Sequence, residues 1–141
     1  MPSRLTKTGC ILLVGLASSL ALADAVVVVS AQSPVSTLTR SELADIYLGR
    51  TNRFPGGQPA MPVDQRENSP AYIAFYRNYL GQTPAQIKMH WSRLIFTGRG
   101  QPPRSLADHQ AMADFVAGQA TAIGYVDDAY VDERLRVVAI D

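Results

Sequence analysis

The stretch that decides the fold is Ala25-Val26-Val27-Val28-Val29, a β-branched run without polar alternation. Such a run is typical of a strand that is buried on both faces of a sheet. Ser33-Pro34 ends the run, and Thr39 with Glu42 then forms a capping box, which predicts the start of a helix. Gly49 supplies the stop of this helix. A buried strand followed directly by a helix indicates an α/β domain.

Strand and helix signals alternate along the rest of the chain. Further strands are predicted at residues 60–63, 122–126 and 135–140, and further helices begin at Ser69, at a second capping box of Thr83 and Gln86, and at Ser105 with Asp108. The aromatic residues of the second helix are expected to pack in the core. The third helix carries Ile87, Trp91, Leu94 and Ile95 on its apolar face. Strands separated by helices predict a largely parallel sheet with helices on its faces, a three-layer α/β sandwich. The expected core includes Val27, Leu43, Ile46, Phe75, Trp91, Leu94, Phe115, Ile123 and Val138.

Length, charge and cysteine content limit the class of protein. The 141 residues fit one ordinary domain. The 13 basic and 12 acidic side chains leave no basic excess for a nucleic-acid partner, so we expect none. One cysteine excludes a disulfide framework and a cysteine-rich metal site.

Residues 1–23 have the features of a secretory signal peptide. Arg4 and Lys7 precede an apolar run of about 14 residues, which is too short to cross a bilayer as a helix. The run ends in Ala21-Leu22-Ala23, the small residues that a signal peptidase recognises. We therefore expect cleavage after Ala23 and an exported domain at residues 24–141 without stable membrane insertion. A buried N-terminal helix is the alternative.

The sequence contains few signals of catalytic chemistry. The sequence has no G-x-S-x-G elbow, no Walker A motif and no dinucleotide glycine motif. His90 and His109 are 19 residues apart, outside an H-x-x-x-H arrangement, and are interpreted as helix-surface histidines. The spacing of the acids leaves a hydrolytic pair open but does not favour one. We expect no enzyme, no metal and no cofactor.

The segment from Val63 to Pro70 holds the candidate binding site, where a predicted strand ends and a helix begins. Unpaired N–H groups and the helix dipole attract anions to such a terminus. Arg66 adds a planar pair of donors that suits phosphate or carboxylate. Arg66, Asn68 and Ser69 are therefore the candidate oxyanion ligands. In the alternative interpretation, Asn68 or Ser69 only caps the helix and Arg66 pairs with a nearby acid.

Three segments resemble a known family in the same order along the chain. Residues 38–49, LTRSELADIYLG, resemble the L-t-x-x-E-L-a-x-I-F-x-G helix of the substrate-binding proteins of phosphate ABC transporters. Residues 122–126, AIGYV, match the G-A-I-G-Y-v strand of that family, and residues 96–103, FTGRGQPP, resemble a signature of its short exported homologues. The resemblance runs from about Val26 to Val126. It implies one lobe of a type II periplasmic binding protein.

The resemblance also implies a function. It suggests a periplasmic solute-binding protein for phosphate or a related small oxyanion, used in transport or sensing with a transporter, a sensor protein or a second copy as partner. Arg66 matches the family's arginine, and Ser69 approximately matches its serine. Pro70 and Ala71 replace the family's glycine and threonine, which removes one N–H and one hydroxyl. We therefore expect weak binding. The alternative is a non-catalytic periplasmic interaction or sensing module that has lost tight ligand binding.

Overall fold

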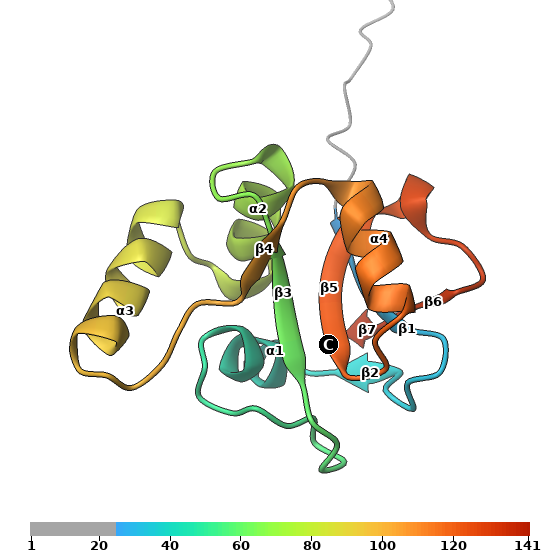
Figure 1. Ribbon diagram of the computed structural model, residues 1–141, viewed down its shortest axis with the longest axis horizontal. Helices are drawn as coiled ribbons and strands as arrows, with labels where there is room; N and C mark the ends of the chain where they lie inside the picture. The colour runs from blue at the N-terminus through green and yellow to red at the C-terminus, as the bar shows by residue number, and fades with distance from the viewer. Residues whose placement is uncertain (1–24) are drawn as a thin grey trace, which may run out of the picture.

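The computed structural model describes residues 25–141, so the expected signal peptide and its cleavage after Ala23 lie outside the described residues. The central sheet has five strands in the order β4-β3-β5-β1-β6 (Figure 1). Their bounds are β1 (Ala25–Ser30), β3 (Met61–Gln65), β4 (Arg104–Leu106), β5 (Ala122–Asp127) and β6 (Leu135–Val137). A separate parallel pair is formed by β2 (Thr37–Leu38) and β7 (Ala139–Ile140).

The central sheet is largely parallel, as predicted. β3 runs parallel to both β4 and β5, whereas β1 runs antiparallel to its two neighbours, β5 and β6. Strand β1 is thus the one member of this sheet that runs against the other four. Val27, Val28 and Val29 are almost completely buried, which confirms that the valine run is a two-sided interior strand.

Short polar motifs set the starts of the helices. The helical segments are α1 (Arg40–Tyr47), α2 (Pro70–Phe75), the π-helical η1 (Tyr76–Leu80), α3 (Pro84–Phe96), α4 (His109–Ala117) and the 3-10 turn η2 (Asp128–Tyr130). The capping boxes predicted at Thr39 and Thr83 are both formed. Ser69 and Asp108 cap α2 and α4 through their side-chain oxygens.

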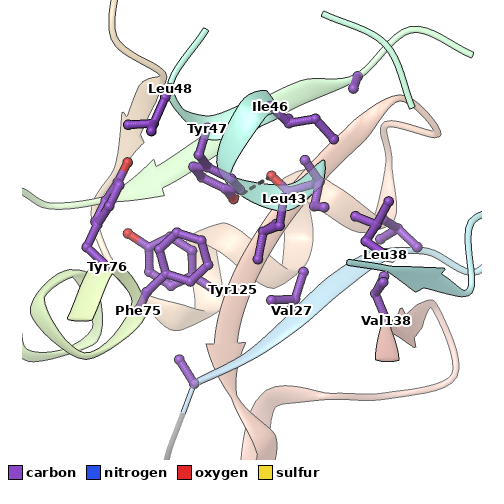
Figure 2. Packing of buried hydrophobic residues seen from close by; sticks show 14 of the residues in the cluster. Val27, Leu38, Leu43, Ile46, Tyr47, Leu48, Phe75, Tyr76, Tyr125 and Val138 are labelled. Carbon is purple, nitrogen blue, oxygen red and sulfur yellow. Dashed lines mark hydrogen bonds between the residues drawn. The ribbon is translucent and has the colours of Figure 1, made fainter. Parts of the chain in front are cut away.

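Two clusters of buried side chains lie on opposite faces of the sheet and make the fold three-layered. One cluster joins α1, α2, η1 and α3 to the sheet, and the other packs α4 against it. Figure 2 shows the first cluster, in which aromatic rings from α1, α2, η1 and β5 meet. Phe75 and Tyr125 stack with their ring centroids 4.1 Å apart and their planes 4° from parallel. The aromatic residues of the second predicted helix therefore pack in the core, as expected.

The structure corrects the predicted start of the fourth helix. Residues 104–106 form β4, in which Ser105 lies opposite Asp64 of β3. The helix begins at His109, and Asp108 is its N-cap, whose side chain accepts a hydrogen bond from the backbone N–H of Ala111. Ser105 instead donates its hydroxyl hydrogen to the carbonyl oxygen of Gln65. Pairing with the free edge of β3 thus extends the sheet where the sequence indicated the first helical turn.

The core prediction is wrong in part. Leu94 and Phe115 are half-buried, and Ile95 of the third helix, which was assigned to its apolar face, is 55% exposed. Figure 1 shows the reason: α3 lies to one side of the sheet, beyond β3 and β4. Only a narrow stripe with Ile87 and Trp91 is buried. None of the helices within residues 25–141 is both long and apolar enough to cross a membrane.

Candidate functional site

A tight turn joins the end of β3 to the start of α2 and carries all three predicted ligands. The backbone N–H of Ser69 donates to the carbonyl oxygen of Arg66 at 3.0 Å, which closes the turn. Asn68 has a φ of 63°, a left-handed conformation that asparagine tolerates better than most residues. Arg66 and Asn68 are exposed, and Ser69 is half-buried. The structure therefore brings Arg66, Asn68 and Ser69 together on one solvent-facing turn.

The alternative interpretation, in which Asn68 or Ser69 only caps the helix and Arg66 pairs with an acid, holds for the cap but not for the ion pair. Ser69 does cap α2, because its Oγ accepts the backbone N–H of Tyr72 at 3.3 Å. Arg66, in contrast, belongs to none of the three ion pairs found within residues 25–141. Its guanidinium therefore presents a positive charge to solvent at the beginning of a helix.

Several backbone N–H donors of this turn are engaged in hydrogen bonds within it or are absent. Pro70 has no N–H, and the N–H groups of Ser69 and Tyr72 donate within the turn. Ala71 supplies the remaining N–H of the first helical turn. The Ser69 hydroxyl accepts one hydrogen bond and keeps its own hydrogen to donate. A small anion at this turn would thus meet Arg66 and a short set of neutral donors.

A buried carboxyl group lies on β3, two residues before Arg66. Asp64 is 6% exposed and accepts hydrogen bonds from the hydroxyls of Tyr76 at 2.8 Å and Tyr125 at 3.0 Å. Burial raises the pKa of Asp64 to about 7, although the two tyrosine hydrogen bonds oppose this rise. Burial also raises the pKa of Tyr76 and of Tyr125 well above the usual range, so both hydroxyls remain protonated donors. This cluster was not predicted; the available signal was a lone acid that follows three apolar residues at the end of a short strand.

A second network ties the ends of β3 and β5 to α4. Gln65 Nε2 donates to the carbonyl oxygen of Tyr125 at 2.8 Å and lies 3.0 Å from His109 Nδ1. The backbone N–H of Asp127 donates to the same His109 nitrogen at 3.0 Å. Because two donors converge on Nδ1, the proton of the neutral imidazole lies on Nε2. His109 is therefore a half-buried structural residue, which corrects its assignment to the helix surface.

His90 differs from the prediction in the same way. It is half-buried, and its Nε2 lies 2.8 Å from the carbonyl oxygen of Leu48, so it links α3 to the end of α1. Within residues 25–141, no group of three His, Cys, Asp or Glu side chains is placed to hold a metal ion.

A cavity of about 290 Å³ lies beside the turn, between α3 and the β3–β4 edge. Asp64, Gln65 and Glu67 line it from the β3 side, and Trp91 lines it from α3. Arg66, Asn68 and Ser69 are not among its lining residues. The predicted ligands therefore border this cavity without forming its wall.

The fold of this chain is similar to part of several solved phosphate-binding proteins. A protein from Clostridium perfringens, described as a phosphate ABC transporter substrate-binding protein with bound phosphate, has a TM-score of 0.66 at 20% identity, covering 84% of this chain and 45% of that one. An ABC-type phosphate transport receptor from Vibrio cholerae has a TM-score of 0.65 at 18% identity, covering 83% and 46%. PstS from Borrelia burgdorferi has a TM-score of 0.63 at 11% identity, covering 84% and 47%.

No protein-family model and no curated protein matches the sequence. The chain spans less than half the length of each of these three solved proteins. With the sheet order and the two covered faces described above, the structural matches confirm the predicted fold class. The chain has the α/β fold of about one half of a phosphate-transporter substrate-binding protein.

Proposed function

We propose that this chain is an exported solute-binding lobe that takes phosphate or a related small oxyanion at the β3–α2 turn. Arg66 is the observation that carries the proposal. It is exposed, it belongs to no ion pair within the described residues, and it lies three residues before Ser69, the N-cap of α2. A guanidinium offers two parallel donors to an oxyanion, and Asn68 with the Ser69 hydroxyl lies on the same turn.

The proposal includes weak binding. The turn closes on itself through Ser69, and Pro70 removes a donor, so few neutral N–H groups remain for the ligand. An open turn also leaves its donors in competition with water and screened by salt. Millimolar affinity corresponds to about −4 kcal/mol, a magnitude suited to one exposed arginine and a helix terminus.

Export is part of the same proposal. Residues 1–23 are proposed to be a cleaved signal peptide and residues 24–141 a single periplasmic domain, because a charged start, an apolar run and Ala21-Leu22-Ala23 occur in that order. In the periplasm, the lobe would act with a transporter, a sensor protein or a second copy. We propose no catalytic role for it.

A second candidate function rests on the shortage of free hydrogen-bond donors at the turn. If Ser69 serves only as a cap and Pro70 blocks close approach of an anion, the chain is a non-catalytic interaction or sensing module without a functional ligand. Both functions use the same fold, so the response to phosphate separates them.

Calorimetric titration of phosphate into the wild type and three variants tests the proposal. Arg66→Ala should abolish the saturable heat, and Arg66→Lys should weaken binding because the planar fork is lost. Arg50→Ala is the matched control, since Arg50 is also exposed but pairs with Asp45 on α1. Equal phosphate affinity in the Arg66→Ala variant and in the wild type would refute the assignment of the site.

A further inference from the structure

Charge is distributed unevenly along this chain. Residues 108–141 contain seven acidic and two basic side chains. Residues 68–107 contain no Asp or Glu, but carry five basic side chains: Arg77, Lys88, Arg93, Arg99 and Arg104. The second set includes all of α3 and the loop that follows it. A nearly neutral protein therefore has one strongly basic segment.

The outer face of α3 combines this charge with exposed apolar side chains. Ile87 and Trp91 face the core. Met89 and Phe96, seven residues apart and hence two turns along the same side of the helix, are 56% and 93% exposed. Arg93 lies between them and contacts the Met89 sulfur at 3.4 Å through its Nη2.

The end of α3 extends this surface. Arg99 follows Phe96 in the exposed loop, whereas Ile95, although 55% exposed, lies on the side of α3 that lines the cavity. Lys88 is exposed near the start of the helix and lines the cavity together with Glu67. We call the set Met89, Arg93, Phe96 and Arg99 the α3 outer surface; Lys88 and Ile95 lie at its border with the cavity. Its cations flank a small apolar centre.

The position of α3 decides which kind of partner fits this surface. The helix lies at one extreme of the molecule, beyond β3 and β4 (Figure 1), so its outer surface is a convex projection. A single phenylalanine that protrudes between cations can be buried only by a partner that deforms to surround it. The headgroup layer of a bilayer has this property, and its anionic lipids attract Lys and Arg.

We propose that the α3 outer surface docks this protein on membranes that carry anionic phospholipid headgroups. Phe96 and Met89 enter the headgroup region, while Arg93 and Arg99 contact the phosphates. The association is peripheral, reversible and sensitive to salt, because the electrostatic attraction acts only within a Debye length of the surface. It does not depend on oxyanion binding at Arg66.

Amide hydrogen exchange of the full chain, followed by mass spectrometry, tests this docking at the residues concerned. Vesicles of phosphatidylcholine, with and without phosphatidylglycerol, are the probe. Exchange in peptides from residues 84–101 should slow with phosphatidylglycerol, remain unchanged with phosphatidylcholine alone, and recover in high salt. The local readout separates α3 from any contact made by the apolar N-terminal segment.

Matched variants distinguish docking through the α3 outer surface from nonspecific adsorption to vesicles. The Met89→Ser/Phe96→Ser double variant should lose the protection, whereas Val137→Ser, at a 44% exposed position on β6, should keep it. Arg93→Gln/Arg99→Gln should also lose protection, and Arg50→Gln/Arg53→Gln, with the same change in net charge, should not. Unchanged exchange with anionic vesicles, or protection retained in the Met89/Phe96 variant, would overturn the proposal. Protection that instead grows with protein concentration without vesicles would assign the surface to a second copy.

Discussion

Tyr76 donates its phenolic hydrogen to Oδ2 of Asp64 across 2.8 Å, and both side chains are buried. Tyr125 supplies the corresponding hydrogen bond to Oδ1. Helix η1 and strand β5 are thereby both joined to β3 through one carboxyl group. This group is costly to ionise in the folded state, since burial outweighs the two hydrogen bonds and raises its pKa to about 7.

The free energy of unfolding should therefore fall as pH rises from about 4 to about 7. The unfolded chain loses the Asp64 proton near pH 3.8 and the folded chain near about 7, so the folded state binds more protons between these values. The stabilisation is complete below the lower pKa and is lost through the higher one. A difference of about 3 in pKa corresponds to at most about 4 kcal/mol.

Urea unfolding across this pH range, in the wild type and Asp64→Asn, measures the effect. Asparagine keeps one acceptor oxygen and cannot ionise, so its variant should lose most of the slope. Asp45→Asn, at an exposed side chain that pairs with Arg50, is the control and should retain the slope. A wild-type slope that survives in Asp64→Asn would show that another group causes it.

Gly124 should resist replacement because α4 packs directly on it. A Cβ added there would lie 2.4 Å from the sulfur of Met112 and 3.1 Å from Cγ2 of Val116, and both of these side chains are fully buried. Gly124→Ala should lower the free energy of unfolding by about 1–3 kcal/mol, the usual cost of overpacking. Gly118→Ala is the control, since its nearest neighbours would be at 3.7 Å. Equal denaturation midpoints for the two variants would contradict this account of the packing.

Ser69→Ala should lower stability and phosphate binding together. The Ser69 side chain accepts the N–H of Tyr72, and loss of such a cap costs about 1 kcal/mol. The hydroxyl is also a proposed donor to the oxyanion. Ser92→Ala, at an exposed position inside α3, should change neither quantity appreciably. Chemical denaturation and phosphate calorimetry on the same samples check both effects, and intact binding in Ser69→Ala would remove this hydroxyl from the proposed site.

Local sequence signals predicted much of the architecture because they act over a few residues. The valine run of β1, the capping boxes at Thr39 and Thr83, and the cap at Ser69 are formed where the sequence places them. Strand β4 was missed because three residues carry little periodicity and their pairing with β3 is a non-local event. Ile95 was misplaced because helical spacing does not reveal where the sheet edge ends.

The candidate site was predictable in part for the same reason. A strand end, an arginine and a helix cap are adjacent in sequence, so the turn from Arg66 to Ser69 could be located. The Asp64 cluster could not, since Tyr76 and Tyr125 approach it from 12 and 61 residues away. The hydrogen bonds of His109 likewise depend on the meeting of β3, β5 and α4.

Phosphate titration calorimetry on the wild-type protein at moderate salt, paired with sedimentation analysis, decides whether the β3–α2 turn binds an oxyanion as a half-site. We expect saturable binding in the millimolar range by a monomer, because one open turn offers Arg66 and few neutral donors. Absence of saturable heat would contradict the oxyanion site and favour the interaction module. Micromolar affinity in a species that remains monomeric would contradict the claim that this lobe binds as half of a site.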